Sequence, residues 1–143
     1  MQRPTQTDGR VHGVIVGCRD HAGRWLLIRR GACVAAPLKV CFPGGAVEPG
    51  EDRDAAAVRE MHEELGIEVK LHGQVWRHDF DDRELTLWGY LGSFNGDAIR
   101  PDPQEVSEVL WLTADQVCQH PDAMPMTEAF VEALEKVVSR SGG

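Results

Sequence analysis

The chain has 143 residues, of which 42% are hydrophobic, and its formal net charge is −8. This length suggests one domain with its own core, and the acidic balance argues against a general nucleic-acid binder. The apolar runs are short and broken by arginine or glycine, which excludes a membrane-spanning helix, and the N-terminus does not resemble a signal peptide. The four cysteines form no CxxC pair, so we expect reduced thiols and a cytoplasmic protein without nucleic-acid or membrane partners.

The first part of the chain predicts a tail and two strands. Residues 1–10 are polar and predict a flexible tail in front of a single domain over residues 11–140. The stretch VHGVIVGC, residues 11–18, is β-branched and apolar, which predicts a buried strand. After the turn DHAG, the stretch RWLLIRR over residues 24–30 predicts the second strand of a hairpin.

The rest of the chain alternates strands and helices. Its apolar periodicity and its turn residues predict a helix over 52–65, strands over 67–80 and 83–94, a strand over 108–113, a short helix capped by Thr113, and a helix over 126–140. Gly66 follows the first of these helices at the position where glycine commonly ends a helix. This order of elements predicts an α/β fold with a mixed β-sheet packed between helices.

The predicted helix over residues 52–65 carries three carboxylates beside its apolar stripe. At about 100° per residue, the side chains of Glu60, Glu63 and Glu64 share one side of the helix, next to the core-facing arc. Like charges this close destabilise a helix, whereas Mg²⁺ or Mn²⁺ favours a set of oxygen ligands. The spacing alone leaves two interpretations, a divalent-metal site or a solvated acidic helix face.

The loop before this helix favours the metal interpretation without deciding it. Gly44 and Gly45 let the backbone approach closely, with a carbonyl free to join a coordination shell. Arg59 can reach back to Glu51 and hold the loop against the helix.

The stretch from Gly45 to Ile67 resembles a complete Nudix box, G-x5-E-x7-R-E-U-x-E-E-x-G-U, in which U is an apolar residue. The matching positions are Gly45, Glu51, Arg59, Glu60, Met61, Glu63, Glu64, Gly66 and Ile67. Because this many positions match at fixed spacing, the motif is specific. We identify the chain as resembling the MutT-like members of the Nudix hydrolase family, a resemblance that implies the α/β/α sandwich of that family.

The resemblance also implies an activity and a set of roles. Nudix hydrolases use Mg²⁺ or Mn²⁺ to cleave a diphosphate bond, commonly in a nucleoside diphosphate linked to another group, which includes nucleoside triphosphates. The metal ligands implied by position are Glu60, Glu63, Glu64 and the carbonyl of Gly44. Glu51 and Arg59 would form the salt bridge that orients Glu60. Family members often form dimers, so a homodimer is a further expectation.

The general base is implied to lie outside the box. In many family members a glutamate before a late strand has this role, and Glu105 and Glu108 both precede Trp111 in the matching region. We favour Glu105, while Glu108 or a glutamate of the box stays an alternative.

Basic and aromatic residues are the candidates for substrate contact. Arg29 and Arg30 end the strand RWLLIRR, and strand alternation allows only one of them to face the substrate; we favour Arg29, with Lys39 as a weaker phosphate contact. Aromatic rings after the box could stack on a base or simply pack in the sheet. These rings are Trp76, Phe80 and Trp88, and Phe80 is the one taken as a substrate contact.

Two other functions compete with diphosphate hydrolysis. A non-catalytic nucleotide-sensing module on the same fold would be expected to have lost glutamates of the box, and this chain keeps them all. An isopentenyl-diphosphate isomerase needs further catalytic residues, including a cysteine, and Cys41 lies near the right region. The sequence markers of several other substrate classes are absent, which favours a MutT-like nucleoside triphosphate pyrophosphatase or an unassigned small Nudix enzyme.

Overall fold

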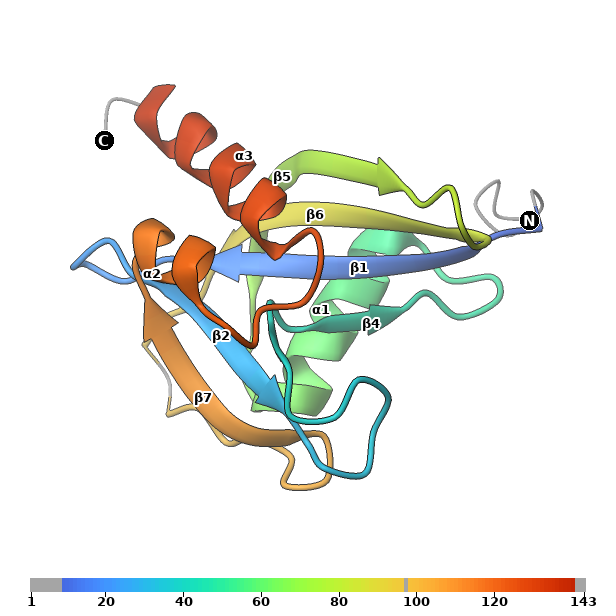
Figure 1. Cartoon of the computed structure of the whole chain (residues 1–143), viewed down its shortest axis with the longest axis horizontal. Coiled ribbons are helices and arrows are strands. Elements are labelled where there is room, and N and C mark those ends of the chain that lie inside the picture. The colour runs from blue at the N-terminus through green and yellow to red at the C-terminus, as the bar shows by residue number, and fades with distance from the viewer. Residues whose placement is uncertain (1–8, 97, 141–143) are drawn as a thin grey trace.

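The computed structural model describes residues 9–96 and 98–140 of the chain, and its layers are seen in Figure 1. The strands are β1 (Val11–Cys18), β2 (Trp25–Arg30), β3 (Val40–Cys41), β4 (Gly44–Ala46), β5 (Lys70–Asp79), β6 (Leu85–Ser93) and β7 (Val106–Leu112). The helices are α1 (Arg53–Leu65), α2 (Ala114–Gln119) and α3 (Thr127–Arg140). The predicted helices and strands are thus confirmed, with boundaries that differ by a few residues, and β4 is an additional strand in the predicted loop.

The strands form two sheets. A mixed four-stranded sheet has the order β4-β1-β6-β5, in which β1 and β6 are parallel, and a three-stranded antiparallel sheet has the order β3-β2-β7. The prediction that residues 11–18 and 24–30 form a hairpin is wrong, because β2 pairs with β3 and β7 instead of β1. The turn DHAG reverses the chain as predicted, but it carries the chain from one sheet to the other.

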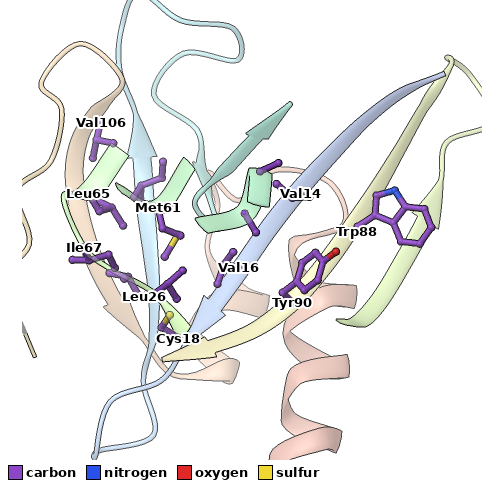
Figure 2. Packing of buried hydrophobic residues seen from close by; sticks show 14 of the residues in the cluster. Val14, Val16, Cys18, Leu26, Met61, Leu65, Ile67, Trp88, Tyr90 and Val106 are labelled. Atoms are coloured by element: carbon purple, nitrogen blue, oxygen red, sulfur yellow. The ribbon is translucent and has the colours of Figure 1, made fainter. Parts of the chain in front are cut away.

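Helices cover the two sheets on both sides. On one side, Met61 and Leu65 of α1 pack against Val14 and Val16 of β1 and Leu26 of β2, as Figure 2 shows. On the other side, α2 and α3 enclose a second cluster, built around the fully buried Trp25, Leu27, Val117, Phe130 and Leu134. Successive residues of β2 point to opposite faces, so this one strand contributes to both clusters. The arrangement is the α/β/α sandwich that the sequence predicts.

The helix α1 begins and ends where its flanking residues predict. Asp52 precedes it in an extended conformation, and Gly66 follows it with φ 68°, donating its backbone N–H to the carbonyl of His62 at 2.9 Å. A residue with a Cβ would be strained at this left-handed position, which explains the glycine. The helix is therefore fixed in length and phase, and this phase sets the direction of its carboxylates.

The predicted tail falls mostly outside the described residues, which begin at Gly9. Arg10, placed in the tail by the prediction, donates hydrogen bonds to the carbonyls of Phe80 and Leu85 at 3.1 and 2.6 Å and to Thr86 Oγ1 at 2.9 Å. It thus joins the start of β1 to the turn between β5 and β6. Within the described part of the chain, no helix has the length and apolar composition needed to cross a membrane.

Candidate metal and diphosphate site

Arg59 joins the loop before α1 to the carboxylates of the helix. Its Nε and Nη2 donate to the two carboxylate oxygens of Glu51 at 2.8 and 3.0 Å, and Nη2 also donates to the carbonyl of Ala46 at 3.0 Å. Its Nη1 donates to Glu60 at 3.0 Å and to Glu63 at 3.1 Å. Hydrogen bonds with Arg59 hold the pKa of Glu51 below its usual value, and those with Glu51 raise the pKa of Arg59. The geometry expected between Arg59 and Glu51 is therefore present.

Two carboxylates of α1 are buried beside β4. Glu64 is 6% exposed and accepts one hydrogen bond, from the backbone N–H of Gly44 at 3.2 Å, while Glu60 is 9% exposed and lies against Gly45. Burial, followed by the charge of Glu60, raises the pKa of Glu64 to about 8. Burial also raises the pKa of Glu60, although Arg59 opposes this effect. Without a cation, ionised carboxylates in this position are unfavourable.

These carboxylates suit a hard divalent cation. The donor set consists of oxygen atoms, as Mg²⁺ and Mn²⁺ require, and a cation would offset the cost of burying Glu60 and Glu64 as anions. Glu63 is exposed and turned toward Arg59, so ligation by all three carboxylates requires its side chain to rotate. The role of the Gly44 carbonyl stays a prediction.

One group of possible metal ligands lies close together in the described part of the chain, away from α1. Cys118 of α2 and Glu128 and Glu132 of α3 have ligand atoms within 4.8 Å of one another. This group is on the side of the sheets opposite α1, and burial, followed by the nearby negative charges, raises the pKa of the Cys118 thiol. It therefore does not take part in the site built by α1.

The raised pKa of Glu64 predicts how the metal-free protein responds to pH. Between its ordinary value of about 4.5 and its folded value of about 8, the folded state binds more protons than the unfolded state, so the free energy of unfolding falls as pH rises. Glu64→Gln removes this loss. We expect the variant to be more stable than wild type by about 2–4 kcal/mol at pH 8.5 and nearly equal to it at pH 4.5.

Chemical denaturation in EDTA across this pH range measures the difference. The control is Glu63→Gln, because Glu63 is exposed on the same helix. A difference between Glu64→Gln and wild type that stays constant with pH would show that Glu64 ionises without penalty.

An apolar cavity lies across β4 from the carboxylates. Its volume is ≈ 230 Å³, and its walls include Gly13 and Ile15 of β1, Leu87 of β6, and Met124 and Met126 from the loop before α3. Gly44 and Gly45 line this cavity and also contact Glu64 and Glu60, so backbone without side chains separates the apolar cavity from the carboxylates. The cavity and the carboxylates therefore adjoin opposite sides of the same short stretch of backbone.

Few polar side chains line the cavity. Arg30 does so, and its charge acts on the carboxylate of Glu64. Thr127, the first residue of α3, is only 4% exposed, and no hydrogen bond from the described residues reaches its hydroxyl. Thr127 therefore places a hydroxyl-bearing side chain at the wall of the cavity.

The two candidates for the general base have different surroundings. Glu105 is exposed in the turn before β7, and after burial its negative charge is among the causes that raise the pKa values of Glu60 and Glu64, so it lies near these carboxylates. This turn is tied to α1, because the backbone N–H of Asp102 donates to the carbonyl of Glu64 at 2.8 Å. Glu108 instead accepts a hydrogen bond from Arg29 at 3.0 Å.

The predicted preference for Arg29 over Arg30 is reversed by the geometry. Arg30 lines the cavity, whereas the guanidinium of Arg29 is bonded to Glu108, Asp122 and the carbonyl of Leu38. Strand alternation allowed one arginine to face the cavity, but the sequence did not show which. Lys39 is exposed in front of β3 and does not line the cavity.

The predicted stacking ring also lies elsewhere. Phe80 follows β5 and packs edge-on against His78, with ring centroids 4.7 Å apart and Arg83 beside it, outside the cavity lining. Trp88 is buried on the α1 side and donates to His12 Nδ1 at 3.0 Å.

The sequence did not point to Met124–Thr127 as residues of the cavity wall. An irregular loop before a helix has no periodic pattern from which its side-chain directions could be predicted.

The family model of the NUDIX domain matches residues 9–134 of the chain.

The chain belongs to the Nudix family.

Its relatives include enzymes of two kinds. This Nudix chain is 37% identical to the 8-oxo-dGTP diphosphatase of Escherichia coli (strain K12) over an alignment of 125 residues, and the alignment covers 83% of this chain and 92% of that protein. It is 31% identical to an isopentenyl-diphosphate Delta-isomerase of Streptomyces griseus, covering 91% of this chain and 71% of that protein. Its fold is similar to the crystal structure of a MutT protein from Methanosarcina mazei Go1, with a TM-score of 0.75 and 22% identity over 89% of this chain and 94% of that chain.

The predicted resemblance to MutT-like Nudix hydrolases is confirmed by these matches. The chain is a Nudix hydrolase, and residues 45–67 of its Nudix box form the contact between β4 and α1 described above.

Proposed function

We propose that this Nudix hydrolase cleaves the diphosphate bond of a nucleoside diphosphate linked to another group, with Mg²⁺ or Mn²⁺ as its cofactor. Nucleoside triphosphates are the first substrate class to test, since a relative with 37% identity is an 8-oxo-dGTP diphosphatase. The observation that carries the proposal is the pair of buried carboxylates, Glu60 and Glu64, separated from an apolar cavity by Gly44 and Gly45.

The two regions suit the two parts of such a substrate. The base or sugar enters the apolar cavity, where the buried hydroxyl of Thr127 offers one hydrogen bond. The phosphates lie at the carboxylate side, where Arg30 contributes a positive charge. Lys39 and Phe80 keep only a peripheral role in this arrangement, because neither lines the cavity.

We assign the catalytic roles from the positions of the acidic residues. A bound Mg²⁺ or Mn²⁺ would neutralise the diphosphate and acidify the attacking water. Glu60, Glu63 and Glu64 would hold the cation, and the hydrogen bonds of Arg59 orient Glu60. Glu105, which lies near these carboxylates, would accept the proton of the attacking water as general base.

Isomerisation of a prenyl diphosphate is the weaker alternative. Cys41 lines the cavity, as that function would require, and an isomerase is among the relatives. Burial, however, raises the pKa of the Cys41 thiol to about 11, so the thiolate is scarce at neutral pH.

A panel of diphosphates tests the proposal. Purified protein is incubated with canonical and oxidised nucleoside triphosphates, ADP-ribose, nucleotide sugars and isopentenyl diphosphate, each with Mg²⁺, with Mn²⁺ and with EDTA. We expect metal-dependent release of two phosphate-bearing products from at least one nucleotide. A product of unchanged mass from isopentenyl diphosphate would support the isomerase, and tight binding without turnover would support a sensing module.

A further inference from the structure

The segment between α2 and α3, residues 120–126, forms one wall of the cavity, and we call it the cavity loop. Met124, Pro125 and Met126 of this loop line the cavity. The backbone N–H of Val40 donates to the carbonyl of Asp122 at 2.9 Å, and the N–H of Met124 donates to the carbonyl of Val40 at 2.8 Å. The cavity loop is therefore paired with β3 along one short stretch.

The side chain of Arg29 also attaches the cavity loop to the sheet. It lies opposite Val40 in the register of β2 and β3, and its Nη1 donates to Asp122 Oδ2 at 2.9 Å and to the carbonyl of Leu38 at 3.0 Å. Its Nε donates to Glu108 Oε1 of β7 at 3.0 Å. One guanidinium thus connects β2, β7, the segment before β3 and the cavity loop.

We propose that Arg29 is a positioning residue, which holds the cavity loop through Asp122 so that Met124, Pro125 and Met126 close the cavity. It would thereby control the binding of the group linked to the diphosphate without touching that group. The inference rests on the proposed function only in assigning a substrate to this cavity; the contacts themselves do not depend on it.

The strength of the contact between Arg29 and Asp122 determines how much substrate affinity is lost when either side chain is replaced. Isolated surface ion pairs contribute about 0–1 kcal/mol, and the side chain of Asp122 is 45% exposed. Arg29 itself is only 23% exposed, and losing its side chain also leaves the carbonyl of Leu38 without this hydrogen bond. We therefore expect the loop to shift or loosen rather than unfold, and substrate affinity to fall about fivefold.

Methionine methyl groups report the loop position directly. The chain has four methionines, two of them in the cavity loop, and Met61 is fully buried beneath α1. With ¹³C-methyl methionine, Arg29→Gln and Asp122→Ala are expected to move or broaden the signals of Met124 and Met126 and to leave that of Met61 in place. Arg24→Gln is the control, because it removes a similar pair, with Asp20 at 2.8 Å, in the turn between β1 and β2.

Kinetics with the panel compound that wild type hydrolyses fastest give the functional test. Arg29→Gln and Asp122→Ala should each raise KM about fivefold and change kcat less than twofold, and the double variant should be no worse than either single variant. Arg29→Lys, which keeps the charge, should restore part of the affinity. An equal loss in kcat, or additive losses in the double variant, would overturn the positioning role.

The kinetics and the methyl spectra test the proposed function and the role of Arg29 separately. If wild type hydrolyses no compound, the proposed function fails, while the methyl spectra still decide whether Arg29 holds the loop. Unchanged signals of Met124 and Met126 in both variants would overturn the inference even if turnover is normal. If Arg29→Gln does not fold, Asp122→Ala and Arg29→Lys provide the same comparison.

Discussion

Replacing Glu64 by glutamine is expected to lower Mg²⁺-dependent hydrolysis by about 10³-fold, which corresponds to about 4 kcal/mol in the activation barrier. Glu64 is buried against Gly44, and glutamine retains its shape and can still accept the N–H of Gly44. The amide has no negative charge for a cation, so metal affinity and rate should fall while the fold remains. Glu63→Gln should also lower the rate, although its carboxylate is exposed and bonded to Arg59.

Steady-state rates over a range of Mg²⁺ and Mn²⁺ concentrations check this expectation. Glu68→Gln is a matched control, because Glu68 is an exposed glutamate just after the box and outside the proposed site. Circular dichroism confirms that each variant is folded. If Glu64→Gln keeps more than a tenth of the wild-type rate, Glu64 is not a metal ligand.

Replacing Gly44 by alanine should have the largest effect on stability. A Cβ at Gly44 would overlap the backbone carbonyl of Val14 in β1, and a strand backbone cannot move aside as a flexible side chain can. Either β4 separates from β1 or the strands shift, at a cost of about 3 kcal/mol or more. The same movement removes the hydrogen bond from Gly44 to Glu64, so activity should fall with stability.

Gly50→Ala is the control that introduces backbone strain without the steric overlap expected at Gly44. Gly50 is in the same loop and has φ 78°, but a Cβ there would meet no atom within 4 Å. Its substitution should cost only about 1 kcal/mol and leave the rate unchanged. Denaturation midpoints and initial rates of the two variants give the comparison, and equal destabilisation would show that crowding at Gly44 is not decisive.

Local features of the sequence predicted α1 and the contact between Arg59 and Glu51 well. The helix boundary depends on Asp52, Gly66 and an apolar period, all of which act within a few residues, and the direction of Glu60 and Glu64 follows from the phase of the helix. Arg59 and Glu51 are close enough in sequence for their contact to be inferred from spacing. These predictions required no knowledge of how distant segments meet.

The errors arose where distant segments decide the geometry. A turn signal at DHAG cannot tell whether the next strand pairs with β1 or joins another sheet. The choice between Arg29 and Arg30 depends on Asp122 and Glu108, which are far along the chain. The cavity wall formed by Met124 to Met126 is placed by pairing with Val40, an interaction that no local pattern of the sequence predicts.

The backbone of Gly44 and Gly45 separates the cavity from the carboxylates, and this separation has a consequence for how the substrate preference of such an enzyme can evolve. The carboxylates are supplied by α1, early in the chain, whereas part of the cavity wall comes from residues 120–126. Under the proposed function, mutations in that late segment would alter which molecule is accepted and leave the carboxylates of α1 in place. The two properties could then diverge independently, and a library randomised at Met124 and Met126 is the natural starting point for redirecting selectivity.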